Sequence, residues 1–420
     1  MANHPSSGSI NINSVNFRLM VIGQIISILG SALLRFALSL YVLDITGRAD
    51  IYATLYAFSN LPLLISPVGG TIADRFNRRN LMVLFDFTSS AVIFMYYLSL
   101  RLGGTSILLT AAVMMLLSVI SSMYEPAVTA SIPLLVKEEH LEGANGLVNG
   151  VQALSNVAAP LIGGMFYGIF GVRALVFISG TAFFCSAILE LFIRIPFHKR
   201  EFTRPVLPTM AADLKEGFSY VVRNPLILRS MVLAALMNLI LTPLFVVGGP
   251  VILRVAMKST DAMYGIGMGT INLATILGAL SIGAVAGKMR MDNLYRLLAA
   301  ITLLILPMAL SVTPALISCG FYPSYLLFLA CAVPIAMIMT IISIFIVTKV
   351  QKETPNENLG KVMAIITAAA QCAAPLGQLV YGFIFQTFSA RLFLPALFIC
   401  IAMALVSLAA RHLWAEITVS

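Results

Sequence analysis

Long apolar stretches separated by short polar turns make up most of the chain. A bilayer core takes about 20 apolar residues per helical span, and twelve stretches reach that length with few charged positions. The pattern therefore predicts an all-α membrane protein with twelve transmembrane helices. The predicted spans are 17–42, 51–72, 80–101, 105–127, 144–168, 173–195, 226–248, 262–287, 293–312, 322–347, 361–386 and 390–412.

One long polar interval, residues 196–225, divides the spans into two groups of six. It begins with prolines and basic residues, and Leu214, Phe218 and Val221 then recur at helical spacing on one side. This spacing predicts a linker with an amphipathic helix along the membrane face. The predicted organisation is an N-terminal tail (1–16), an N-terminal bundle (17–195), the linker (196–225), a C-terminal bundle (226–413) and a C-terminal tail (414–420).

Short internal matches indicate that the two groups of spans are related. Ala159-Pro160-Leu161 recurs as Ala374-Pro375-Leu376, and Tyr167-Gly168 recurs as Tyr381-Gly382. Both matches are offset by about half the chain. Parallel repeats of six spans are typical of transporters whose substrate binds near the membrane midplane between the halves. The chain is therefore predicted to form two pseudo-symmetric six-helix bundles.

Composition and charge agree with a membrane protein. Hydrophobic residues make up 60% of the chain and charged residues 10%, whereas soluble proteins have roughly 25% charged residues. With the N-terminus inside, nineteen Lys and Arg residues fall on the cytoplasmic side, six fall outside, and Arg35 lies within the first span. Since cytoplasmic loops carry the excess of basic residues, the net charge of +9 reflects topology and not nucleic-acid binding. Both termini are predicted to be cytoplasmic.

The short loop between the second and third predicted spans contains a glycine and an aspartate, followed by three arginines. Gly70 and Asp74 precede Arg75, Arg78 and Arg79. A glycine near the end of a span lets helices approach closely, and a carboxylate there can accept hydrogen bonds from a helix N-terminus or a basic residue. A tight basic turn explains the arginines alone, but it does not explain their spacing from Gly70 and Asp74.

This spacing resembles the conserved loop of the major facilitator superfamily, Gly-x-x-x-Asp-(Arg/Lys)-x-Gly-Arg-(Arg/Lys). Asn77 stands where the second glycine is usual, and Asn tolerates the left-handed backbone conformation that glycine adopts. The resemblance implies an alternating-access transporter in which Gly70, Asp74, Arg75, Arg78 and Arg79 gate the cytoplasmic side. It also implies that Asp74 contacts a helix dipole in the outward-facing state.

The predicted fifth span resembles the antiporter signature of the same family. The matching positions are Gly146, Ser155, Ala159, Pro160, Gly163 and Gly164, although Ser155 and Ala159 stand where glycine is usual. Small residues let helices cross closely, and a proline removes one backbone hydrogen bond and can bend a span. The resemblance implies export, and an ordinary packing face is the alternative.

The resemblance covers most of the chain and is closest to the macrolide-efflux-like subgroup. It is carried by the run from Asn16 through Phe87, by YEPA at 124–127 and by LKEGF at 214–218. That subgroup exports macrolides, other hydrophobic drugs or siderophores by proton antiport. The resemblance therefore implies proton-coupled efflux of a small amphipathic or hydrophobic compound. A symporter or a lipid or siderophore transporter of the same fold is the alternative, and a membrane enzyme is less favoured.

The energy source follows from the absence of other motifs. The sequence contains no phosphate-binding loop, hydrolase elbow or metalloprotease motif, so uphill transport must draw on an ion gradient. We expect no cofactor and no metal, with the proton gradient as the driving force. The expected partners are a small-molecule substrate, protons and the lipid bilayer, and no nucleic acid. The expected state is a monomer in the bacterial inner membrane.

Ionisable residues inside spans are candidates for proton coupling, because charges are costly in the bilayer. Asp86 and Glu125 are the candidate carboxyls, with structural ion pairs to the basic loop as the alternative. Arg35 is a candidate for holding a carboxylate or an anionic substrate. Glu190 precedes Arg194 by four residues, which predicts an interfacial intrahelical ion pair.

The residues that line the transport cavity are harder to select from the sequence. Span amides and two neighbouring large side chains form a pool of candidates, although such residues also mediate helix packing. The pool is Asn60, Met123, Tyr124, Gln152, Asn156, Asn238, Asn272, Gln371 and Gln378.

Overall fold

The computed structural model describes residues 15–62, 72, 76–103, 106–137, 140–196, 206–285 and 289–415. Helices fill these ranges, and no strand occurs in them. Nine helices of the described residues are long and apolar enough to cross a membrane. One of the nine contains two predicted spans, and the two remaining spans fall on shorter helices, so the predicted all-α fold is confirmed.

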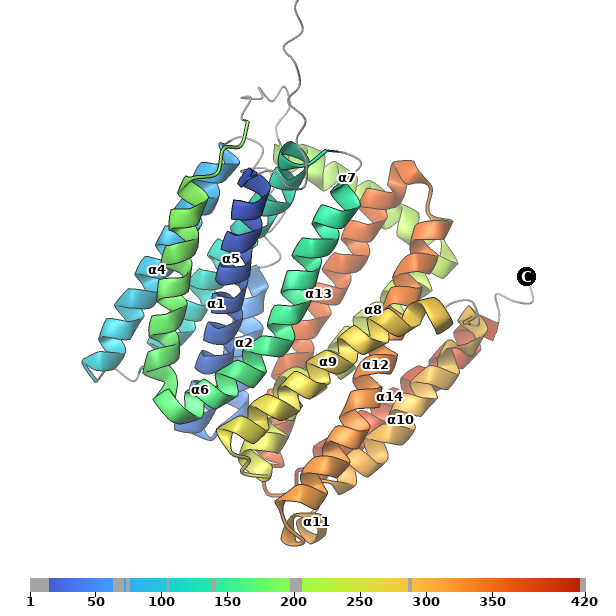
Figure 1. The fold of residues 1–420 in the computed structure, drawn as a ribbon. Helices are drawn as coiled ribbons and strands as arrows, with labels where there is room; N and C mark the ends of the chain where they lie inside the picture. The colour runs from blue at the N-terminus through green and yellow to red at the C-terminus, as the bar shows by residue number, and fades with distance from the viewer. Residues whose placement is uncertain are drawn as a thin grey trace, which may run out of the picture. The chain divides into compact units, whose positions relative to one another are not determined.

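The helices group into two compact units (Figure 1). The first unit comprises Met1–Leu38, Pro62–Ala159 and Ile169–Thr203, and the second comprises Ser39–Leu61, Pro160–Gly168 and Arg204–Ser420. The second unit thus includes the end of the first span and part of the fifth. The domain boundary placed within 196–225 stays a prediction.

Within the described residues, the long helices of the first unit are four. They are α1 (Val15–Thr46), α4 (Arg78–Arg101), α5 (Ile107–Leu135) and α6 (Leu141–Leu191), of which α1 and α6 also extend into the second unit. Apolar side chains of these helices, including Met20, Met82 and Ile132, form one buried cluster. This cluster packs against one end of the polar network described below.

The helix α6 contains the predicted fifth and sixth spans. Its direction changes at Gly171, whose φ of 72° and ψ of 178° are not helical. A residue with a side chain rarely adopts this positive φ, so glycine permits the turn between two adjacent spans. The connection is therefore a single-residue turn.

The second unit contains the remaining helices. Its bounds are α2 (Ala49–Asn60), α7 (Val206–Arg223), α8 (Pro225–Pro243), the π-helical turns η3 (Leu244–Gly248) and η4 (Val251–Ala256), α9 (Asp261–Val285), the 3₁₀ turn η6 (Met291–Asn293), α10 (Leu294–Leu310), α11 (Pro314–Ser318), α12 (Phe321–Glu353), α13 (Asn356–Thr387) and α14 (Phe393–Ala415). The main pairs are α8 with α13, α10 with α14, α9 with α12, and α2 with α13. Figure 1 shows α10, α12 and α14 as neighbouring long helices.

Two glycines let α13 approach its neighbours. A Cβ atom on Gly377 would collide with the Leu239 carbonyl of α8 and lie 2.7 Å from Pro243. A Cβ atom on Gly382 would lie 2.5 Å from the Ala53 side chain of α2. Because real Cβ contacts are longer than this, the backbone separation of these helices depends on glycine.

The predicted linker helix corresponds to α7. Val221 is buried and Gly217 packs against Lys361 of α13, whereas Phe218 is 53% exposed. The Lys361 ammonium also contacts the Glu216 carboxylate at 2.7 Å. An exposed Phe218 is compatible with a helix along the membrane face, and that placement stays a prediction.

Candidate functional site

A buried polar network crosses the interior of the first unit. Two of its members are carboxyls, Asp86 of α4 and Glu190 of α6, with exposed fractions of 2% and 0%. The Tyr124 hydroxyl of α5 donates to Glu190 Oε1 over 2.7 Å, and the Gln24 amide of α1 donates to the Tyr124 oxygen over 3.0 Å. The Ser27 hydroxyl of α1 donates to Asp86 Oδ1 over 3.2 Å. Four helices thus contribute to two hydrogen-bonded groups, Gln24–Tyr124–Glu190 and Ser27–Asp86, which both include residues of α1.

The two carboxyls interact electrostatically with each other, but neither forms a salt bridge with a described residue. Asp86 Oδ2 and Glu190 Oε2 are both buried and have no hydrogen-bond partner within the described part of the chain. A buried polar atom without a partner costs free energy. These oxygens are therefore the atoms of the network best placed to take up a proton.

Glu190 was predicted as an interfacial partner of Arg194, and that prediction was wrong. Its carboxyl is completely buried and bonded to Tyr124. The Glu190 side chain packs beside Gly23 of α1, where a Cβ atom would lie 3.6 Å from Glu190 Cγ. Tyr124, which was included in the cavity-lining pool, likewise lies inside the unit.

Glu125 and Arg35 lie apart from this network. Both side chains are exposed, and the Arg35 guanidinium is close enough to Glu125 to interact with it electrostatically. The sequence treated Asp86 and Glu125 alike as candidate carboxyls. The structure distinguishes them, since Asp86 has a second buried carboxyl as its neighbour and Glu125 has a cation.

The described part of the basic loop contacts the end of α6 and the last third of α5. The Arg79 guanidinium donates to the backbone carbonyls of Glu190 and Leu191 at the end of α6, and Arg78 donates to the Ala130 carbonyl of α5 over 2.9 Å. Cations near helix C-termini satisfy free carbonyls and oppose the helix dipole. Gly70, Asp74 and Arg75 lie outside the described residues.

Asn77 begins α4 in an extended conformation, with φ of −63°, and its side chain accepts from the Asn80 amide. The left-handed conformation considered for Asn77 is therefore not the one observed. Its role is that of an N-cap, which is a favoured position for asparagine.

The antiporter-like motif of α6 is divided by burial. Gly146 is exposed and its Cβ position is open, whereas Ser155, Ala159, Pro160, Gly163 and Gly164 are buried. Within the second unit, a Cβ atom on Gly164 would lie 2.5 Å from the Asp261 carbonyl and 2.8 Å from Gly265 Cα of α9. The Pro160–Gly164 segment is therefore a close contact with α9, and Gly146 is not part of it.

Near this contact lies an ionic cluster that the sequence did not reveal. Arg254 Nε and Nη2 donate to the two Asp44 carboxylate oxygens over 2.8 and 3.0 Å, and Nη2 is 2.5 Å from Asp261 Oδ1. Arg254 Nη1 donates to the Ser259 carbonyl over 2.7 Å. Bidentate arginine–carboxylate pairs are strong and directional, so the cluster fastens the end of α1 to η4 and the start of α9.

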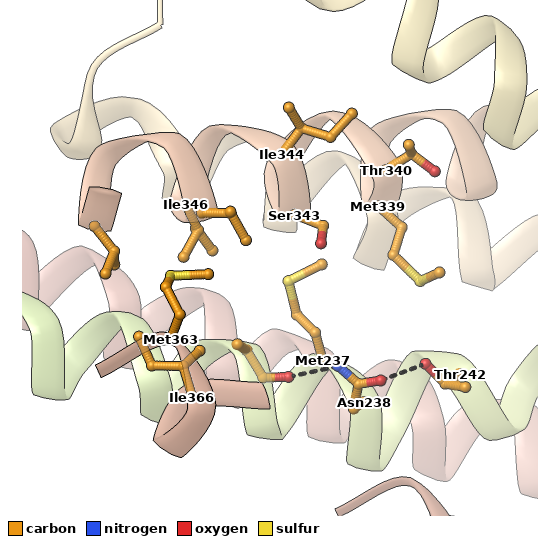
Figure 2. Close-up of a pocket in the computed structure, with 13 residues that line it drawn as sticks. Met237, Asn238, Thr242, Met339, Thr340, Ser343, Ile344, Ile346, Met363 and Ile366 are labelled. Carbon is orange, nitrogen blue, oxygen red and sulfur yellow. Dashed lines mark hydrogen bonds between the residues drawn. The ribbon is translucent and has the colours of Figure 1, made fainter. Parts of the chain in front are cut away.

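A cavity of about 220 Å³ opens between α8, α12 and α13. Figure 2 shows Met237, Met339 and Met363 around it, with Ser343 directed toward Met237. None of the described residues lining it is charged. Thioethers adapt to irregular apolar shapes, and the volume is below the ~300 Å³ typical of complete ligand sites. The cavity therefore suits one uncharged, mostly apolar part of a ligand.

Asn238 is the member of the predicted amide pool that lines this cavity. Its amide donates to the Ala234 carbonyl over 3.0 Å, and its oxygen accepts from Thr242 over 3.2 Å (Figure 2). Both polar ends of Asn238 are thus engaged within α8. A ligand would compete with Thr242 for the amide oxygen.

Comparison with known proteins places most of the chain in one family. Residues 20–377 match the Major Facilitator Superfamily family model. Macrolide efflux protein A of Streptococcus pyogenes is 22% identical over 376 residues, which cover 85% of this chain and 86% of that protein. Multidrug efflux pump Tap of Mycolicibacterium fortuitum is 24% identical over 357 residues, which cover 81% and 82%. The resemblance inferred from the sequence motifs is therefore confirmed.

Solved structures agree at the level of the fold. A variant of the nucleoside transporter NupG has a TM-score of 0.77 at 11% identity, covering 95% of this chain and 100% of that one. A D-xylose–proton symporter has a TM-score of 0.66 at 10% identity, with coverage of 94% and 96%. At these identities the likeness shows the fold alone.

Proposed function

The chain belongs to the Major Facilitator Superfamily, and from this premise we propose that it exports a small amphipathic or hydrophobic compound in exchange for protons. The transporter function and multi-pass membrane location follow from the family. The observation that carries the proposed coupling is Asp86, a carboxyl buried among helices without a cationic partner in the described residues. Reversible protonation is the usual role of such a carboxyl in a membrane carrier.

Export of an apolar compound is supported by two further observations. The cavity of the second unit has methionines and no charged lining residue among those described, and relatives over most of the chain carry the names macrolide efflux protein and multidrug efflux pump. A substrate with a large uncharged portion fits both. A macrolide and a hydrophobic dye are therefore the first compounds to test.

Alternating access supplies the mechanism that we propose. In it, the basic loop with Arg78 and Arg79 controls the cytoplasmic side, and the contact of Gly164 with α9 controls the other side. Arg35 and Glu125 serve as a second charged pair that a cationic or anionic group of the substrate can reach. The distribution of basic residues favours cytoplasmic termini, and we place the protein as a monomer in a bacterial inner membrane.

Purified protein in proteoliposomes tests the proposal directly. In vesicles with the cytoplasmic face outward, an acidic interior should drive accumulation of the dye or macrolide, and adding the compound should release protons from the interior. Accumulation that instead needs an acidic exterior would assign symport. Unchanged coupling in both Asp86→Asn and Glu125→Gln would remove these carboxyls from the mechanism.

A further inference from the structure

We propose that Asp86 and Glu190 together form a single proton-binding site that holds one proton between them, positioned by Tyr124 and connected to the basic loop by Arg79. The proposal rests on the proposed proton-coupled transport and names its coupling site. Glu190 was not expected to take part, because the sequence offered it Arg194 as a partner. The structure instead buries it in the same unit as Asp86, with which it interacts electrostatically.

Full ionisation of the pair is strongly disfavoured by its surroundings. Both carboxyls are at least 98% buried, they repel each other, and each keeps one oxygen without a hydrogen bond from a described residue. Burying an unpaired charge costs several kcal/mol, and repulsion between two like charges adds to that cost. A proton on the pair therefore stabilises this packed arrangement, and its loss makes the arrangement less stable.

The hydrogen bonds indicate that one proton is enough. The Tyr124 oxygen accepts from Gln24, so its own proton is directed to Glu190 Oε1. The 2.7 Å separation is at the length typical of a hydroxyl bound to a carboxylate. Asp86 Oδ1 also receives a donor, from Ser27. Each carboxyl thus has one hydrogen-bond donor that can stabilise its ionised form. The proton is therefore assigned to the pair and not to either residue alone.

Among the described residues, the groups around the pair come from three helices. From α1 come Gln24 and Ser27, from α5 comes Tyr124, and from α6 comes Ser186, whose hydroxyl interacts with Asp86 and donates to the Gly23 carbonyl. The charged side chain that touches this end of α6 is Arg79 of α4, through the Glu190 and Leu191 carbonyls.

This last contact couples the charge of the pair to the basic loop. When the pair loses its proton, its net charge becomes one unit more negative, directly beside the helix end that Arg79 holds. Arg79 then experiences a stronger attraction toward α6. A ligand shifts a conformational equilibrium only through such a difference in interaction free energy. The proton can therefore bias the position of the loop that begins α4.

Infrared difference spectra of the purified protein in lipid, between acidic and alkaline buffer, test the site without any substrate. The double variant Asp86→Asn/Glu190→Gln supplies the baseline for all other carboxyls. One shared proton predicts that the wild type and each single variant lose the same amplitude of the protonated carboxyl band. Glu125→Gln should leave the amplitude unchanged. A wild-type amplitude equal to the sum of the two single variants, or to the baseline, would overturn the proposal.

Tyr124→Phe keeps both carboxyls and guards against variants that fail to fold. It should keep the one-proton amplitude but move the band, because Glu190 loses its hydrogen bond. A spectrum identical to that of the wild type would contradict the positioning role of Tyr124. Transport assays separate this proposal from the general one: proton-driven export that persists in the double variant Asp86→Asn/Glu190→Gln refutes the pair alone. A shared proton without proton-driven export refutes the proposed function alone.

Discussion

The Arg79 guanidinium donates to the backbone carbonyl of Glu190 over 3.4 Å, so a basic-loop residue and a buried carboxyl meet at one helix end. The same guanidinium bonds the Leu191 carbonyl. These two carbonyls lie in the last turn of α6, and the Glu190 carbonyl also accepts from the Ile193 amide over 3.1 Å. Arg79 therefore adds a charged donor to the end of α6.

Arg79→Ala should lower the unfolding free energy by about 1–2 kcal/mol, because two helix-end carbonyls lose a charged donor. The unfolding free energy of Arg79→Lys should lie between those of the wild type and Arg79→Ala, since an ammonium does not reproduce the planar fork of a guanidinium. Thermal unfolding in detergent measures both. Arg101→Ala, at the opposite and exposed end of α4, is the matched control. Equal unfolding midpoints for Arg79→Ala and Arg101→Ala would contradict the helix-end role.

Gly164→Ala should destabilise the contact between α6 and α9. The added methyl would lie 2.5 Å from the Asp261 carbonyl, and relieving an overlap with backbone typically costs about 1–3 kcal/mol. Gly146→Ala belongs to the same motif but has an open Cβ position, so it should leave thermal stability and transport unchanged. Similar effects of the two substitutions would show that the motif does not act through this contact.

Local sequence features predicted the spans, the linker helix and the buried carboxyl Asp86, since each depends on hydropathy or on a charge within an apolar run. They failed for Glu190, because an arginine four residues away offered a local explanation and only tertiary packing shows which helix face is enclosed. Arg254 and Asp44 are separated by 210 positions, so no spacing rule connects them. The residue spacing identified the basic loop, but the contact of this loop with α6 joins residues far apart in the sequence and could not be predicted from that spacing.

Arg254→Ala should lower the unfolding free energy by about 1–3 kcal/mol, because the substitution leaves Asp44 and Asp261 without their shared cation. The three side chains are mostly buried, with exposed fractions of 19%, 27% and 24%. Arg48→Ala is the control, since Arg48 is 55% exposed in its pair with Asp50 and exposed pairs add little stability. Thermal unfolding of both variants measures the two losses of stability. Equal losses would contradict a structural role for the Arg254 cluster.

The predicted topology can be tested with a native cysteine. Cys319 is exposed and follows the short helix α11, between α10 and α12, and cytoplasmic termini place this turn outside the cell. With the other four cysteines replaced, a membrane-impermeant maleimide should label Cys319 in intact cells. A Lys215→Cys variant in α7 that also lacks Cys319 should be labelled only after permeabilisation. The opposite pattern would invert the assigned orientation.

Ser343→Phe should occupy the cavity between α8, α12 and α13. Ser343 lines the cavity and points toward Met237 (Figure 2), and a phenyl ring there displaces any apolar group of a bound compound. We expect about tenfold weaker binding of a transported dye, equivalent to about 1.4 kcal/mol. Leu326→Phe, on the same helix but 60% exposed, supplies a substitution that adds a ring outside the cavity. Fluorescence titration of the dye into purified protein measures both. If Ser343→Phe and Leu326→Phe bind the dye as the wild type does, the cavity does not hold the apolar part of the substrate.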